Sequence, residues 1–172
     1  MILTKGIGTG IISTAAKAGV ADPAILQNAV DSMTALNAPA AQAIAGMSVH
    51  ALTDITGFGL LGHASEMARG AGLSFRLSYS RIPILRGARE YAAIGMVPGG
   101  GYCNRDHFGK AISFTAEVPE VEQIILFDPQ TSGGLLVALP PEDAQKMIKK
   151  LSGKAVIVGK VIRQKDRNII VR

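Results

Sequence analysis

The order of short apolar segments, broken by glycine and proline, is the feature that most limits how this chain can fold. Segments typical of β-strands occupy residues 1–4, 49–52, 73–78, 111–114 and 135–139. Helical patterns occupy residues 11–18, 22–36, 40–45, 60–68, 87–94, 121–126 and 140–151, and Asp22-Pro23 is a typical helix start. We interpret residues 98–106 as a glycine-rich loop, and residues 155–162 with 168–171 as a terminal β-hairpin. Because strands and helices do not alternate strictly, the pattern predicts one α+β layered domain over residues 1–172.

The core of such a domain must be aliphatic. Aromatic residues make up only 5% of the chain and Trp is absent, so Ala, Ile, Leu, Val and Met have to fill the interior. Hydrophobic residues make up 48%, which is typical of a globular protein and argues against disorder.

Charge and cysteine content narrow the partners and the compartment. The 18 basic and 13 acidic residues give a net charge of +5, which favours an anionic partner. Charge alone leaves nucleic acid and a phosphate-bearing small molecule open. No basic run exceeds Lys149-Lys150 and none is interleaved with aromatics, so we expect no nucleic-acid partner. The single cysteine, Cys103, suits a reducing cytoplasm, and no apolar run reaches about 18 residues, so we expect no membrane span.

A carboxylate lies beside two glycines in residues 51–63, Ala-Leu-Thr-Asp-Ile-Thr-Gly-Phe-Gly-Leu-Leu-Gly-His. Asp54 falls at a strand-to-helix turn, where it could hold a Mg²⁺ ion that bridges phosphate oxygens. Gly57 and Gly59 could let the backbone approach a ligand closely, next to the free N–H groups of a helix start. The alternative is that Asp54 or Thr56 only caps the helix.

A second turn, residues 128–134, reads Asp-Pro-Gln-Thr-Ser-Gly-Gly. Its acid, two hydroxyls and two glycines could contact phosphate, and the same residues also make ordinary tight turns. A third glycine-rich turn, residues 5–10, has neither P-loop nor dinucleotide-binding spacing, although Lys5 could neutralise a phosphate. Cys103 has no base at a recognisable spacing, and His63 is expected to be a hydrogen-bonded packing residue.

Taken together, these segments resemble selenophosphate synthetase (selenide, water dikinase). The matching stretches are Leu3-Thr4-Lys5 with Gly8-Thr9-Gly10-Ile11, residues 51–63, Val97-Pro98-Gly99-Gly100 and residues 126–136, in the family's order. The wider superfamily includes aminoimidazole ribonucleotide (AIR) synthetase. The resemblance implies a carboxy-terminal domain with α/β/α layers, a mixed β-sheet flanked by helices and a partly ferredoxin-like topology.

The resemblance also implies an activity. Family members use ATP and Mg²⁺ to make selenophosphate from selenide, releasing AMP and phosphate, and act as homodimers whose amino-terminal domains form much of the ATP site. The family's metal-binding acid maps onto Asp54. The resemblance says less about individual residues of 128–134. The nucleotide-binding positions that we expect are Lys5, Thr9, Thr53, Gly57, Gly59, Thr131, Ser132 and Gly133.

The chain departs from the family at two points. Nothing in it corresponds to the amino-terminal region that carries the family's catalytic Cys or selenocysteine and its Lys, so we expect no catalytic residue here and no turnover by this chain alone. Gly6 also stands where the family usually has Pro. Two alternatives stay open: another ATP enzyme of the superfamily, such as a purine-pathway synthetase or thiamine-monophosphate kinase, and a non-catalytic nucleotide-binding or assembly module.

Overall fold

The computed structural model describes residues 1–172 and contains two four-stranded sheets flanked by helices. The first sheet has the order β2 (Ala51–Asp54), β5 (Leu135–Ala138), β1 (Ile2–Leu3), β6 (Val156–Ile157), and its neighbouring strands are all antiparallel. The second has the order β4 (Ile112–Phe114), β8 (Ile169–Val171), β3 (Ser74–Leu77), β7 (Gly159–Ile162). The predicted α+β class is confirmed, and the second sheet is the mixed one: β8 runs parallel to β3 and β4, whereas β7 is antiparallel to β3.

The two sheets meet at one residue. Val158, between β6 and β7, is fully buried; its N–H donates to the Met1 carbonyl at 3.0 Å, and its own carbonyl accepts from the Ser78 N–H at 2.9 Å. The last segment thus leaves the first sheet as β6 and enters the second as β7. The predicted terminal hairpin is wrong, because β3 inserts between β7 and β8 and takes the hydrogen bonds that a hairpin would have made.

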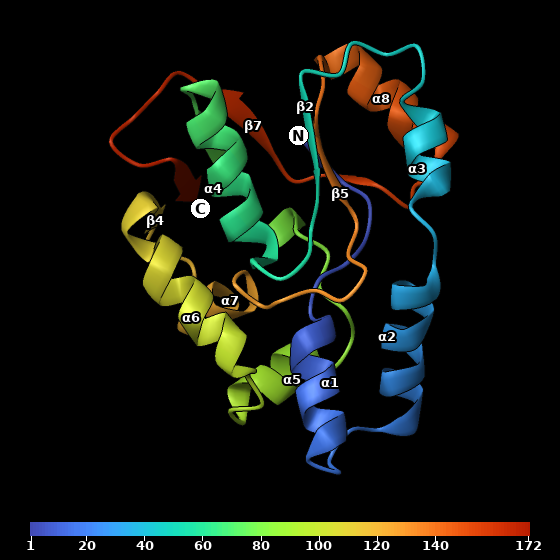
Figure 1. Cartoon of the computed structure of the whole chain (residues 1–172), viewed down its shortest axis with the longest axis vertical. Coiled ribbons are helices and arrows are strands. Elements are labelled where there is room, and N and C mark those ends of the chain that lie inside the picture. Colours follow the sequence, from blue (N-terminus) through green and yellow to red (C-terminus); the bar gives the residue numbers. More distant parts are fainter.

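The helices divide into three groups (Figure 1). Helices α3 (Ala38–Ala43) and α8 (Pro141–Lys150) pack together beside the first sheet, and α4 (Gly59–Ala71) packs on the second. The others gather at the end of the molecule away from α8: α1 (Thr9–Lys17), α2 (Pro23–Thr34), α5 (Ala88–Ala93), α6 (Gly99–Phe108) and α7 (Glu120–Ile125). Two single-turn 3-10 helices, η1 (Tyr79–Arg81) and η2 (Gly109–Ala111), complete the chain. None of the helices is long and apolar enough to cross a membrane.

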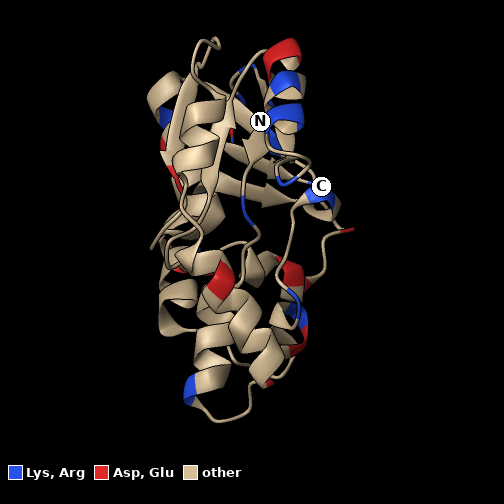
Figure 2. Cartoon of the chain, turned by 90° about the vertical axis from the view of Figure 1, so that its right-hand side faces the viewer, with Lys and Arg blue, Asp and Glu red and all other residues tan.

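Local sequence signals account for several helix ends. The Asp22 carboxylate accepts from the N–H groups of Ala24 and Ile25, so the predicted cap of α2 is confirmed. Charges on α8 follow the helix dipole, with Glu142 and Asp143 in the first turn and lysines in the last turn (Figure 2).

Residues 98–106 are not a loop, and that prediction is wrong. They form most of α6, which begins after Pro98 with three consecutive glycines. Packing overrides the low helix propensity of glycine here: Gly101 is buried against Val97, and Gly100 faces the Pro129 ring, where a side chain would have little room.

The core is aliphatic, as predicted. The larger cluster contains 30 buried residues and lies between the sheets and helices α1, α4, α5 and α7. A second cluster of 8 buried residues joins the first sheet to α3 and α8. Phe75 and Phe127 are the only aromatic residues among the largest fully buried side chains. Strand β5 is buried throughout, whereas β2 is an edge strand that alternates between partly buried and exposed residues. The exposed end of β2 carries Asp54.

Candidate functional site

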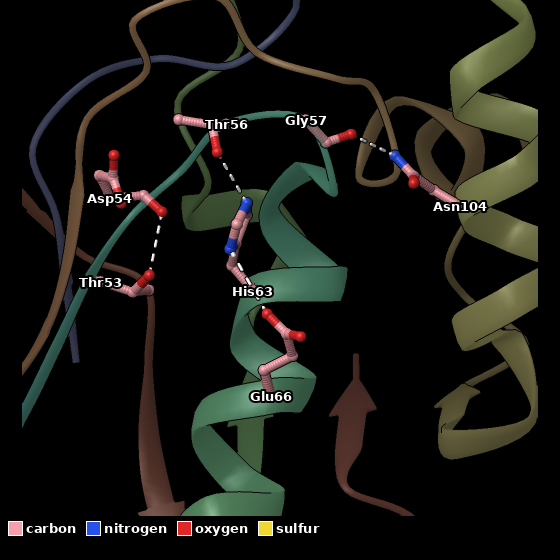
Figure 3. Close-up of polar contacts among 7 residues, drawn as sticks. All are labelled: Thr53, Asp54, Thr56, Gly57, His63, Glu66 and Asn104. Carbon is pink, nitrogen blue, oxygen red and sulfur yellow. Dashed lines mark hydrogen bonds and ion pairs between the residues drawn. The ribbon is translucent and has the colours of Figure 1, made fainter.

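Asp54 lies at the end of the edge strand β2 with a free carboxylate. Its backbone pairs with Leu135 of β5, and the next residue, Ile55, donates from its N–H to the Gly134 carbonyl at 2.8 Å. The side chain is exposed and takes part in no hydrogen bond or ion pair within the chain. Thr53, whose hydroxyl donates to the Asp54 carbonyl at 3.0 Å, lies beside it (Figure 3). The carboxylate can therefore accept a ligand from solvent without breaking a protein contact.

The turn after β2 does not use Asp54 or Thr56 as a helix cap. Helix α4 has Phe58 at its N-cap position, with no side-chain hydrogen bond to the first turn. Thr56 instead makes a 3.1 Å hydrogen bond between its hydroxyl and Nε2 of His63, one turn along α4 (Figure 3). The alternative interpretation of this segment as a simple cap is thus wrong.

His63 holds the turn against α4. Its ring lies 5.3 Å from the Phe58 ring, and its Nδ1 lies 3.8 Å from the Glu66 carboxylate. Burial lowers the pKa of His63, while the negative charges of Glu66 and Asp54 act in the opposite direction. The predicted role of His63 as a hydrogen-bonded packing residue is confirmed.

The two glycines of the turn have different surroundings. Gly57 is exposed and has open space where a side chain would lie, and its carbonyl accepts from Nδ2 of Asn104 at 2.9 Å. Gly59 is buried with φ +68°, and a Cβ there would lie 2.7 Å from the Phe127 carbonyl group. Packing therefore requires glycine at position 59, whereas Gly57 leaves an open backbone surface next to Asp54.

The turns at residues 5–10 and 128–134, which are far apart in the sequence, form one unit. Oε1 of Gln130 accepts from the N–H groups of Gly8 and Thr9 at 3.0 and 3.2 Å and from the Thr9 hydroxyl at 3.1 Å. Oδ2 of Asp128 accepts from the Gly10 N–H at 3.0 Å. These side chains occupy the free N–H groups at the start of α1, so that helix end is closed to a phosphate.

Asp128 is a buried carboxyl with an altered pKa. The residue is fully buried, and its Oδ1 has no hydrogen-bond partner. Burial raises the pKa of Asp128 to about 7, although hydrogen bonds from Gln130 and from the start of α1 favour the ionised form.

The remaining predicted nucleotide-binding positions differ in their exposure and contacts. Thr131 and Ser132 are exposed, and Ser132 has φ 50°, an uncommon conformation for a residue other than glycine. Nζ of Lys5 donates to the carbonyls of Ser132 at 2.8 Å and Ala35 at 2.6 Å, and burial lowers its pKa. Thr9 is buried, and its hydroxyl also accepts from the Thr131 N–H at 3.0 Å.

Gly133 completes this set from inside the fold. It is buried against the Ile55 carbonyl, which leaves no room for a side chain.

The structure thus joins the two specific turns. The Gln130 N–H donates to the Thr56 carbonyl at 2.9 Å, which places the exposed Thr131–Ser132 pair beside the turn that follows Asp54. Asp128 was expected to be able to contact phosphate, and that expectation is wrong because its carboxyl is fully buried against the start of α1. The support that Gln130 and Asn104 give to the turns was not predicted. Asn104 lies in the segment taken for a loop, and its Nδ2 links the carbonyls of Gly57 and Phe127 at 2.9 and 3.0 Å. These contacts join segments that are far apart in the sequence, so only the folded structure shows them.

Comparison with known proteins gives one family. The profile of the family described as AIR synthase related protein, C-terminal domain, matches residues 1–172. The selenide, water dikinase of Pelobacter propionicus is 43% identical over 175 residues, which cover 99% of this chain and 50% of that protein. Selenide, water dikinase 2 of Peptoclostridium acidaminophilum is 44% identical, with the same coverage. The chain therefore spans about half the length of the curated relatives it matches.

A solved structure shares the fold. The hydrogenase maturation protein HypE in complex with ATP has a TM-score of 0.69 with this chain at 16% identity, covering 99% of this chain and 46% of that one. Identity at this level shows the fold alone.

Proposed function

This chain belongs to the AIR synthase related proteins, as their C-terminal domain, and on that basis we propose that it is the C-terminal half of a selenide, water dikinase. The complete enzyme would convert selenide and ATP into selenophosphate, AMP and phosphate. The observation that carries the proposal is the 43% identity to a selenide, water dikinase over 99% of the chain. The free carboxylate of Asp54 next to the open Gly57 backbone supplies a surface on which such chemistry could act.

Asp54 fits one ligand of a shared Mg²⁺ site. No group of three or more His, Cys, Asp or Glu residues in this chain could hold a metal by itself. Mg²⁺ is commonly bound by one or two carboxylates, several waters and the phosphates of the substrate. A single unpaired carboxylate at a strand end meets that requirement when ATP and the other half of the enzyme supply the rest. The bound ion would neutralise charge on the ATP phosphates.

The other residues of the proposed site form one group at or near the surface and one buried group. Gly57, Thr53, Thr131, Ser132 and Lys5 lie at or near the surface, so we assign them to contact with the nucleotide or product. Thr9, Gly59 and Gly133 are buried, so we assign them to holding that surface from behind. The 3.1 Å bond between Thr56 and His63, with the Asn104 contact to Gly57, keeps the Asp54 turn in one conformation. Such positioning lowers the reorganisation needed for phosphoryl transfer.

We also propose partners and a cellular compartment for the complete enzyme. The ATP-bound HypE structure, which shares the fold, and the dikinase relatives support ATP as a substrate. We assign the missing part of the ATP site to the protein's own amino-terminal domain, within a cytoplasmic homodimer.

A paired assay tests the proposal. The full-length protein and the 172-residue chain alone are incubated with ATP, Mg²⁺ and selenide, and AMP is measured with selenide omitted as the control. We expect selenide-dependent AMP only from the full-length protein. Thiamine-monophosphate phosphorylation without selenide-dependent AMP would support another enzyme of the superfamily, and nucleotide binding without any turnover would support a non-catalytic module.

A further inference from the structure

A basic hollow lies on the side of the molecule where β3, η1 and β7 meet the C-terminal residue. Its volume is about 330 Å³, and four of its eight lining residues are basic: Arg76, Arg81, Lys160 and Arg172. No acidic side chain lines it, and the terminal carboxylate of Arg172 is the one negative group on a lining residue. None of the four cations makes an ion pair within 4.0 Å, and none donates a side-chain hydrogen bond to the protein.

The arrangement is unfavourable without a ligand. Arg76 of β3 and Lys160 of β7 are direct partners in the antiparallel register, and like charges opposite each other destabilise a strand pair. Arg76 is also partly buried, which reduces the screening of its charge by water. An anion held between these side chains would remove the repulsion.

The backbone beneath the cations is ordered by the second sheet. Strand β3 is paired on both sides, with β7 and β8. The Arg172 N–H donates to the Leu77 carbonyl at 3.1 Å, and an oxygen of the Arg172 terminal carboxylate accepts from the Tyr79 N–H at 3.0 Å. The hollow therefore presents its charges from a fixed frame, and binding would order only the side chains.

We propose that this hollow binds a small anion with a chain of phosphate groups, such as a triphosphate. A single phosphate carries at most two negative charges, whereas a short phosphate chain carries enough charge to match the cluster of basic side chains. The Ser78 hydroxyl in the lining adds a neutral donor. Single-stranded nucleic acid is disfavoured because no aromatic side chain lines the hollow for base stacking.

The hollow is separate in space from the Asp54 turn. Ile157 of β6 lines it, whereas Asp54 ends β2, and β6 and β2 are the two edges of the first sheet. Two strands lie between them, so about 14 Å separates the two edges at the usual strand spacing. The inference therefore does not rest on the proposed dikinase activity.

Calorimetric titration of the 172-residue chain with tripolyphosphate tests the proposal, at about 50 mM salt where screening is moderate. We expect saturable one-to-one binding. The double variant Arg76→Gln/Arg81→Gln should weaken it about tenfold or more, because two charge-assisted contacts are lost. The matched control is Arg163→Gln/Lys165→Gln, which removes the same charge from exposed residues outside the hollow and should change the affinity less than about twofold.

Further titrations identify which kind of phosphate chain the hollow binds, and thermal melting checks that the variants fold. Equal affinity for ATP and tripolyphosphate would show that the hollow takes a nucleotide by its phosphates, and much weaker ATP binding would assign it to inorganic polyphosphate. Both double variants should melt within a few degrees of the parent, and Lys160→Gln provides a second loss-of-charge variant if one misfolds. Three results would overturn the proposal. They are equal weakening of tripolyphosphate binding in the control variant, tripolyphosphate binding that does not saturate, and tight RNA binding with which tripolyphosphate does not compete.

Discussion

The buried carboxyl of Asp128 should make the stability of this domain fall as pH rises. Asp128 is fully buried beside the start of α1, and one of its oxygens has no hydrogen-bond partner. Two effects oppose each other here. Burial disfavours the charged form, whereas the Gly10 N–H and the dipole of α1 favour it. Burial dominates and raises the pKa to about 7.

The sign and size of this change in stability follow from the difference between the pKa of Asp128 in the folded chain and its pKa in the unfolded chain. The ordinary pKa of this carboxyl is 3.8 and the folded value is about 7, so between these values the folded chain holds a proton that the unfolded chain has lost. Stability from this group is therefore complete below pH 3.8 and lost as pH rises through about 7. Three pH units at 1.36 kcal/mol each correspond to about 4 kcal/mol, as an order of magnitude.

The variant Asp128→Asn isolates this titration. Asn keeps an acceptor for the Gly10 N–H and for Gln130 but cannot ionise. The free energy of unfolding is measured by urea denaturation from pH 4 to about pH 8 for both proteins. The wild type should lose stability relative to Asp128→Asn as pH rises to about 7 and run parallel to it above that. Asp166→Asn, which removes an exposed carboxylate, is the control for the loss of one charge.

Two results would contradict a raised pKa of Asp128 in the folded chain. A difference between wild type and Asp128→Asn that stays constant with pH would show that Asp128 does not change its protonation on folding. A difference that grows in favour of the wild type as pH rises would show that the start of α1 dominates and keeps the carboxylate ionised.

Three further changes test the packing of the two turns by urea denaturation. Gly59→Ala should destabilise the chain by about 2 kcal/mol or more, because it adds a methyl group against the Phe127 carbonyl at a positive φ, whereas Gly57→Ala should have little effect; equal effects would contradict this. Gln130→Leu should cost about 3 kcal/mol, since it leaves three buried donors of Gly8 and Thr9 without an acceptor; a change under about 1 kcal/mol would show that water replaces the amide. Asn104→Ala should cost about 2 kcal/mol through two lost donors, and the exposed Arg105→Ala is its control.

Local signals were enough to predict much of the fold. The Asp22-Pro23 cap, the buried strand at β5 and the aliphatic core all follow from short-range patterns, and each is confirmed. Asp54 could be named as a candidate because the strand and the turn that place it are adjacent in sequence.

The wrong predictions concern segments whose structure depends on residues far away in the sequence. Helix α6 depends on packing against Pro129 and Phe127, which no local pattern in its glycine-rich sequence indicates. The hairpin failed because β3, some 80 residues earlier, pairs with both of its strands. The closure of α1 by Asp128 and Gln130 joins residues about 120 positions apart, so sequence spacing could not show that these side chains occupy the helix start.

Asp54 is the proposed metal ligand that this chain contributes to a selenide, water dikinase. The measurement is the Mg²⁺ dependence of selenide-dependent AMP formation by full-length Asp54→Asn, with Glu90→Gln, an exposed acid on α5 that makes no ion pair, as the control. We expect a rate at limiting Mg²⁺ at least about tenfold lower for Asp54→Asn and a higher half-saturating Mg²⁺ concentration, with both near wild type for the control. An unchanged Mg²⁺ dependence in Asp54→Asn would contradict this role of Asp54.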